Sequence, residues 1–287
     1  KKKKKLSDAS LQLTTRRKVI RRLKDIEDTR RAFMTSQPAT TMRNNIFGVA
    51  MTGIDILDQF NTFMIRGVKG KDSSAATLNG TMDIARYLVK DQYVADVAVE
   101  LLRQDAPELM QRAFRDAALT ETNVLRNTYL SKAGAFVNTL NTASDHIFKR
   151  AVVAGTIDRE LKKKGSSLKE YLEKGMMSEI PDDIITKSLD DSLAFTFQRR
   201  FGGKNASDTN KLVDKTIGAI HKYGLTTIIP FPRYMASQAK FVKDYSVLNI
   251  AYKGGKLTDE EWAKQLTGGA MFTSAYIYQK DNIEQGL

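Results

Sequence analysis

The stretch "IPDDIITKSLDDSLAFTFQ", from Ile180 to Gln198, contains the pattern that decides the fold. Apolar side chains recur along it at steps of four residues, at Ile185, Leu189, Leu193 and Phe197. This spacing places them on one face of an α-helix. Pro181, Asp182 and Asp183 stand in its first turn, where carboxylates suit the positive end of the helix dipole. The stretch therefore predicts an amphipathic helix with one buried face.

The same helical spacing recurs along most of the chain. A helix is expected over residues 42–65, with a largely buried stripe formed by Ile46, Ala50, Ile54, Leu57 and Met64. Another is expected over residues 81–103, with an apolar face of Ile84, Leu88, Ala95, Ala98 and Leu102. Between residues 108 and 164 only Gly134 and Gly155 interrupt the pattern, which favours one long interrupted helix or a stacked pair.

Helix-start signals are clear, whereas strand signals are few. "SLKE" at residues 167–170 and "TDEE" at residues 258–261 both have the spacing of a capping box. The one Asn-Gly pair, at residues 79 and 80, precedes a helical run and does not join two β-branched ones. We therefore predict an all-α, elongated multi-helix bundle with little or no β-sheet. Its expected parts are a basic arm with an amphipathic helix (1–40), a domain of long helices (41–165) and a C-terminal helical domain (166–287).

Composition narrows the class of protein. The chain has 287 residues, of which 41% are hydrophobic, and this suits a folded protein with a real core. It contains no cysteine, which excludes disulfides and thiolate metal sites. It starts at a lysine, has no secretory signal and has no apolar run of transmembrane length, and we expect it to be a segment of a longer protein.

Positive charge is concentrated at the start of the chain. Residues 1–31 contain 13 Lys and Arg against 4 Asp and Glu, out of a net charge of +13. A run of lysines repels itself and gains by displacing counterions from phosphates, so DNA or anionic lipid would both serve as partners. The predicted contact residues are Lys1, Lys2, Lys3, Lys4, Lys5, Arg17, Arg21, Lys24 and Arg31. For residues 17–31 a solvated helix with internal ion pairs is the alternative.

The last predicted helix contains an uncharged stretch of 15 residues from Gln265 to Gln279. It is too short to span a bilayer of about 30 Å unaided. Because apolar groups surround it on nearly every side, it needs burial in a core, an oligomer or a membrane interface. The predicted membrane or subunit contacts are Trp262, Leu266, Phe272, Tyr276, Ile277 and Tyr278.

No stretch predicts a reaction centre. The acidic group Glu179, Asp182, Asp183, Asp190 and Asp191 is interpreted as a solvated helix face, because neighbouring residues on a helix diverge. His146 and His221 lack the partners of a metal site. "RRFGGKNAS" at residues 199–207 lacks the full phosphate-loop spacing. We therefore predict no catalytic residue, no metal and no cofactor.

Two prolines, Pro230 and Pro232, precede a run of aromatic residues. A proline ends one segment because it has no backbone N–H, and its fixed φ angle suits the first turn of the next helix. Tyr234, Phe241, Tyr245, Leu248 and Tyr252 then follow at helical steps and predict a buried aromatic seam. The favoured interpretation is a proline-capped packing helix, and the alternative is a wedge that enters a membrane or nucleic acid.

Several strings occur in an order that resembles a known family. They are "FKRAVVAGTIDRELKKKG", "SLKEYL", "IPDDIITKSLDDSLAFTFQ", "IIPFPRYMASQAKFVKDYS" and "LTGGAMFTSAYIY", between residues 148 and 280. Their order resembles the C-terminal region of the large internal virion, or ejection, proteins of short-tailed phages. The resemblance covers somewhat under half of the chain and contains no catalytic signature.

The resemblance implies a helical, non-enzymatic core protein that lies inside the capsid and is released with the genome. Such a protein would oligomerise and help to form a conduit for genome delivery across the host envelope. The implied partners are copies of itself, other phage core and portal proteins, phage DNA and the host inner membrane. The alternatives are a module that organises DNA in the capsid without reading sequence, and part of a cell-wall lytic enzyme. The family's lytic domain has no match in this chain.

Overall fold

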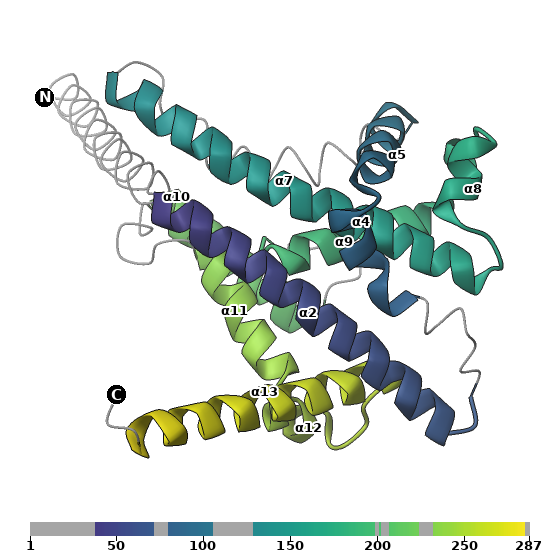
Figure 1. Ribbon diagram of the computed structural model, residues 1–287. Coiled ribbons are helices and arrows are strands. Elements are labelled where there is room, and N and C mark those ends of the chain that lie inside the picture. Colours follow the sequence, from purple (N-terminus) through teal and green to yellow (C-terminus); the bar gives the residue numbers. More distant parts are fainter. Residues whose placement is uncertain are drawn as a thin grey trace, which may run out of the picture.

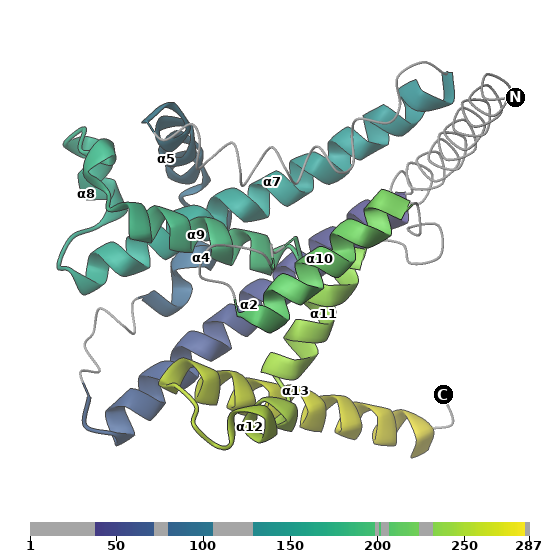
Figure 2. The ribbon, with the colours of Figure 1, turned by 180° about the vertical axis from the view of Figure 1, so that it is seen from behind.

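The computed structural model describes residues 38–71, 80–105, 129–198, 201, 207–223 and 232–284. Within these ranges the chain forms ten α-helices and two single 3-10 turns, and it contains no strand. The predicted all-α fold is therefore confirmed. Helices that diverge from a shared core give the protein an open shape (Figure 1), and the reverse view shows the same arrangement (Figure 2).

The elements follow one another in a simple order. They are α2 (Pro38–Val68), η1 (Gly80–Met82), α4 (Asp83–Val89), α5 (Gln92–Asp105), α7 (Tyr129–Lys163), α8 (Leu168–Glu173), η2 (Met177–Glu179), α9 (Asp182–Phe195), α10 (Asp208–Tyr223), α11 (Pro232–Asp244), α12 (Val247–Lys253) and α13 (Asp259–Glu284). The 35-residue α7 is the central helix, because α2, α4, α5 and α9 all pack against it. Helix α13 packs mainly on α2.

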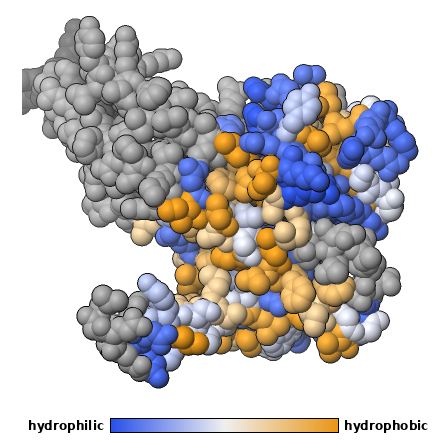
Figure 3. All heavy atoms as spheres, in the orientation of Figure 1, coloured by the Kyte–Doolittle hydropathy of each residue, from blue (hydrophilic) through white to orange (hydrophobic). Residues whose placement is uncertain are grey.

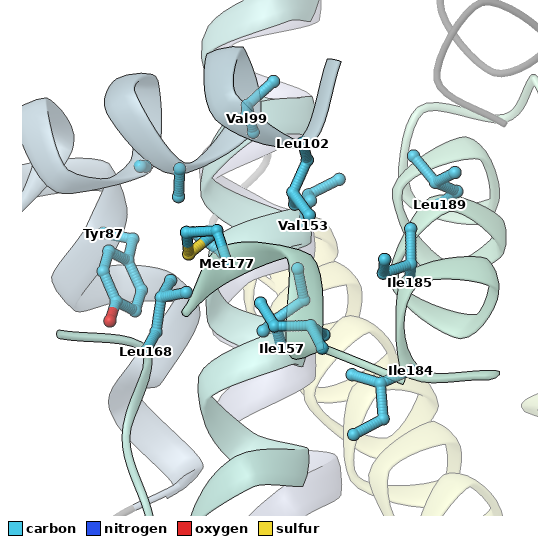
Figure 4. Close-up of a cluster of buried hydrophobic side chains, with 14 of the residues drawn as sticks. Tyr87, Val99, Leu102, Val153, Ile157, Leu168, Met177, Ile184, Ile185 and Leu189 are labelled. Carbon is cyan, nitrogen blue, oxygen red and sulfur yellow. The ribbon is translucent and has the colours of Figure 1, made fainter. Parts of the chain in front are cut away.

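The main hydrophobic core surrounds the C-terminal half of α7. Side chains from α4, α5 and α9 and from the segment between α7 and α9 point toward one another there (Figure 4). Val153, Ile157 and Leu161 of α7 are almost fully buried among them. The periodic apolar residues of the sequence therefore act as expected in this region: Ile185, Leu189 and Leu193 all face this core.

A glycine sets the distance between two of these helices. A Cβ atom added to Gly155 would lie 2.8 Å from Ile84 Cγ1 and 3.0 Å from the Ile84 backbone. Real Cβ atoms rarely come so close, so the absence of a side chain at Gly155 lets α4 rest directly on α7. The sequence presented Gly155 as an interruption, but α7 continues through it as a regular helix.

Two smaller features differ from the helices expected from the sequence. The helix predicted over residues 81–103 is divided in two, because the chain turns at Lys90 and Asp91, whose N–H groups both donate to Arg86 O. Asp91 O then accepts the Ala95 N–H and begins α5. Helix α9 ends at Phe195, and Phe197 has a φ of 53°, a left-handed conformation that carries its buried ring toward α2 and α11.

The stripe predicted to be buried on α2 is wrong. Ile46, Ala50, Leu57 and Met64 are exposed and Ile54 is half-buried, whereas Met51, Thr52, Asp58 and Thr62 are buried. Helix α2 thus turns a partly polar face toward α7 and α13. Its apolar outer face lies at the front of the molecule in the view of Figure 1, where apolar residues gather in the space-filling view (Figure 3).

The predicted aromatic seam is only half correct. Tyr245 is buried and Phe241 is half-buried, and their rings stack at 4.4 Å. Tyr234, Leu248 and Tyr252 are exposed instead. A break at Ser246 separates α11 from α12 and turns Leu248 and Tyr252 away from Tyr245. Tyr234 lies before this break, in α11, where its ring contacts Phe197 at 5.5 Å. Pro232 does begin α11, as the capping interpretation expected.

Both predicted capping boxes are present. Ser167 Oγ accepts the Glu170 N–H at 3.3 Å at the start of α8. At the start of α13, Thr258 Oγ1 accepts the Glu261 N–H at 3.2 Å, and Glu261 accepts the Thr258 N–H at 3.0 Å. The domain boundary expected between residues 165 and 166 stays a prediction, and the main core includes residues from both sides of it.

Candidate functional site

The first half of α13 is attached to the rest of the protein by polar and close backbone contacts. Asn61 of α2 donates to Thr267 at 3.1 Å, and Lys69 and Lys71 both pair with Asp259, at 2.6 and 2.8 Å. Gly268 lies directly against the chain after α11, since a Cβ there would lie only 1.8 Å from Tyr245 O. These contacts fix residues 259–268.

The second half of α13 is exposed to solvent. Every residue from Gly269 to Asp281 is exposed, and among them are Met271, Phe272, Tyr276, Ile277 and Tyr278. Figures 1 and 2 show this half extending away from the other helices toward the C-terminus. An isolated helix that exposes apolar side chains on several sides loses the burial that normally stabilises helices in proteins. We call residues 269–281 the distal arm.

The residues predicted as membrane or subunit contacts all lie on the surface. Their exposed fractions run from 36% at Trp262 to 71% at Tyr278. Trp262 and Leu266 belong to the docked half of the helix, and Phe272, Tyr276, Ile277 and Tyr278 to the distal arm. Further large apolar side chains are exposed on α11 and α12, including Met235, Val242 and Val247. The structure thus places these side chains where a partner can reach them.

A second feature is a polar cavity of about 180 Å³ between α2, α7, α9, α13 and Tyr245. Part of its wall consists of tightly paired charges. Arg159 donates to both carboxylate oxygens of Asp55, at 2.7 and 3.4 Å. Glu160 accepts from Lys163 at 2.9 Å and from Lys187 at 2.7 Å. Such bidentate and doubly paired contacts hold the cavity walls in place.

Two other carboxylates in the cavity lack an ion pair among the described residues. Asp58 accepts a hydrogen bond from the Tyr245 hydroxyl, and Asp191 lies 3.5 Å from the Thr156 hydroxyl. Burial raises the pKa of each carboxyl to about 6, because it removes water that would stabilise the charged form. Burial and the Asp58 charge likewise raise the pKa of Tyr245.

Asp191 corrects part of the sequence interpretation. Asp182, Asp183, Asp190 and Glu179 are exposed, as a solvated face requires, but Asp191 is partly buried and lines the cavity. Neighbouring residues on a helix point in different directions, so one of the two adjacent aspartates faces inward. No motif in the sequence singled out Asp55, Asp58 or Tyr245 as site residues. Asp55, Asp58 and Thr62, which recur at steps of three and four residues on one helix, were the available signal.

The other residues singled out in the sequence are placed as follows. The nine predicted basic contacts within residues 1–31 lie outside the described residues. So do most of "RRFGGKNAS" and the side chain of His221. His146 is half-buried on α7, and burial lowers its pKa. Within the described ranges no group of three or more His, Cys, Asp or Glu side chains is placed to hold a metal ion. None of the described helices has the length and hydropathy of a membrane span.

The chain was compared with protein-family models, curated proteins and solved structures. No protein-family model, no curated protein and no solved structure matches it.

Proposed function

We propose that this chain is a structural segment of a phage internal core protein, without enzymatic activity. It associates with copies of itself through exposed helical faces and helps to form a conduit for genome delivery across the host envelope. Its site of action is first the capsid interior and then the envelope after ejection. The further partners are other core and portal proteins, the phage DNA and the host inner membrane.

The observation that carries this proposal is the distal arm. Thirteen consecutive helical residues are exposed, and five of them are large and apolar. Burying one such side chain stabilises an assembly by about 1.5–3 kcal/mol before entropy is counted. Association with another copy of the chain would bury these side chains, as expected for a protein that oligomerises. The all-α fold and the order of strings between residues 148 and 280 support the phage assignment.

Two measurements test the proposal together. Sedimentation velocity should show oligomers of the chain, and phosphatidylglycerol vesicles should release an entrapped dye when it is added. The double variant Phe272→Asp/Ile277→Asp puts two charges on the distal arm and should abolish both effects. Both positions are exposed, so the variant should fold normally.

A matched control adds the same two charges at polar positions of the same arm, as Ser274→Asp/Gln279→Asp. It should assemble and release dye as the parent chain does. A parent chain that stays monomeric and leaves the vesicles intact would contradict the proposal. If the variant and the control lost assembly and dye release equally, the added charge and not the loss of apolar contacts would be responsible for the effect.

The alternative of a DNA-organising module rests on the charge of residues 1–31, where 13 basic residues outnumber 4 acidic ones. It predicts DNA binding that weakens steeply with salt and has little sequence preference. Deleting Lys1–Lys5 should reduce both the affinity and the dependence of the affinity on salt. Unchanged binding after this deletion would remove the alternative.

A further inference from the structure

The outer face of α2 carries an apolar seam with a heptad spacing. Its residues recur at alternating steps of four and three, which is the spacing by which two helices pack along a coiled coil. They are all exposed within the described part of the chain, and they are Ile46, Ala50, Gly53, Leu57, Phe60 and Met64. We call them the α2 seam. The space-filling view shows the apolar surface that gathers over this helix (Figure 3).

Charged side chains do not interrupt the α2 seam. Asp55 and Asp58 are the charged residues between positions 46 and 64. Asp55 pairs with Arg159 of α7 at 2.7 Å and Asp58 is buried, so both lie on the inner side of α2. The seam therefore runs for about 27 Å along the helix, at 1.5 Å per residue, as one uncharged apolar surface. Exposed apolar surfaces of this extent mark sites of interaction.

The sizes of the seam residues are matched about position 55. When two copies of α2 lie antiparallel and centred there, each seam residue faces the one equally far on the other side of that position. The facing pairs are Ile46 with Met64, Ala50 with Phe60 and Gly53 with Leu57. In two of these pairs an alanine or a glycine faces a large side chain, so each layer of the contact fills evenly. A Cβ added to Gly53 meets nothing within 4 Å in one chain, which leaves room there for Leu57 of a second copy.

A parallel pair and a lipid surface both fit this pattern less well. A parallel pair places each seam residue against its own copy, which leaves a gap between the two Gly53 positions and crowds the two Phe60 rings. A bilayer has no fixed shape, so contact with lipid does not require small residues at the positions equivalent to large ones. The matched sizes therefore favour an antiparallel second copy as the partner.

We propose that two copies of the chain pair through the α2 seam as an antiparallel helix dimer, with its twofold axis at position 55. The same surface then serves on both copies, as an isologous contact requires. The role of this dimer rests on the self-association in the proposed function. Its geometry depends on neither the distal arm nor the phage assignment, so the two proposals can fail separately.

Disulfide cross-linking tests the pairing, because the chain contains no cysteine of its own. Ala50→Cys and Phe60→Cys chains, mixed and mildly oxidised, should form a dimer linked between these two positions, which mass spectrometry of the linked peptides identifies. Either chain alone should give little product, because equal positions lie roughly 15 Å apart along the helix axis and a disulfide needs Cα atoms within about 7 Å. All chains carry Phe272→Asp/Ile277→Asp, so that contacts of the distal arm do not contribute.

A charge at the centre of the seam should break the dimer. Leu57→Asp, added to both cysteine chains, should lower the yield of the mixed product about 10-fold or more, because the dimer would bury an unpaired carboxylate. Leu212→Asp is the matched control, since it makes the same change at an exposed position of α10, and it should leave the yield unchanged. Both leucines are exposed, and circular dichroism melting checks that each variant is folded.

Three outcomes would overturn the proposal. Ala50→Cys chains that cross-link to each other as well as to Phe60→Cys chains would show a parallel pair. A yield that Leu57→Asp leaves unchanged would show random collision of exposed cysteines. Absence of the mixed product would show that a second copy does not cover the seam. In that case, binding to phosphatidylglycerol vesicles that Leu57→Asp abolishes would assign the seam to lipid.

Discussion

Two clusters of buried acidic groups lie beside α7 and differ in how they are neutralised. At the contact with α4, Asp158 is fully buried but accepts from Arg86 at 2.8 Å and Lys162 at 3.0 Å. Asp83 pairs with the same lysine. In the cavity, Asp58 is buried and Asp191 is partly buried, and each contacts a hydroxyl group but forms no ion pair within the described residues. The same type of side chain therefore joins helices through direct ion pairs in one cluster, whereas in the other it has only more distant cations to offset its charge.

The comparison shows why burial by itself does not mark a functional residue. A buried charge is tolerated where direct partners replace the lost water, and it becomes costly where they do not. In the paired cluster the carboxylate of Asp158 also accepts the Leu168 N–H at 2.8 Å, which joins α7 to the start of α8. Within the part of the chain that the structure describes, neither Asp58 nor Asp191 makes a comparable link to a cation.

The largest effect is expected from breaking the paired cluster. Asp158→Ala leaves two cations and the Leu168 N–H without their acceptor, and should lower the free energy of unfolding by about 3–5 kcal/mol. Urea denaturation measures this loss. Asp96→Ala, which removes a half-exposed pair with Arg150, is the control and should lose less than about 1 kcal/mol. A similar small loss in Asp158→Ala would erase the distinction between the two clusters.

A smaller effect is expected from separating the two helices that carry the paired cluster. Gly155→Ala places a methyl group against the Ile84 backbone and should cost about 2 kcal/mol, measured in the same way. The exposed Gly53, where an added Cβ meets nothing within 4 Å, is the control, and Gly53→Ala should not destabilise the protein. If Gly155→Ala left the free energy of unfolding unchanged, the close approach of α4 to α7 would not contribute to stability.

The pH dependence of stability sharpens the comparison further. Asp58 and Asp191 have a folded-state pKa of about 6, above the usual 3.8, so the folded state holds their protons more tightly than the unfolded state. Stability should therefore rise as the pH falls from 7.5 to 5, by roughly 1 kcal/mol for each carboxyl. The double variant Asp58→Asn/Asp191→Asn should lack this rise. A parent and a variant with parallel pH profiles would show that these carboxyls titrate normally.

The smallest effect is expected at the exposed neighbour of the cavity. Asp190→Asn should change the free energy of unfolding by less than about 0.5 kcal/mol at any pH between 5 and 7.5, because Asp190 is exposed. Asp191→Asn should differ from it at pH 7.5 by gaining stability, since it removes a partly buried charge that has no ion pair within the described residues. Identical behaviour of the two variants would place both aspartates on the solvated face.

Much of the fold could be predicted from local patterns, but the candidate sites could not be located as well. The helical periodicity on α9 and the two capping boxes were correct because adjacent turns and backbone donors determine them. The buried face of α2 was predicted wrongly, since the most apolar stripe is not the one that meets α7 and α13. The cavity was missed because its carboxylates come from helices more than 100 residues apart, such as Asp58 and Asp191.

The amino-acid sequence by itself determined that this protein is helical, where several of its helices begin and that its last helix carries an uncharged apolar stretch. These features depend on interactions between residues a few positions apart, which any copy of the sequence makes. Only the tertiary structure decided which faces are covered, that residues 269–281 stand apart from the core and that Asp58 and Asp191 share a cavity. Those outcomes depend on how whole helices cross, and small residues such as Gly155 and Gly268 set these crossings through contacts distant in sequence.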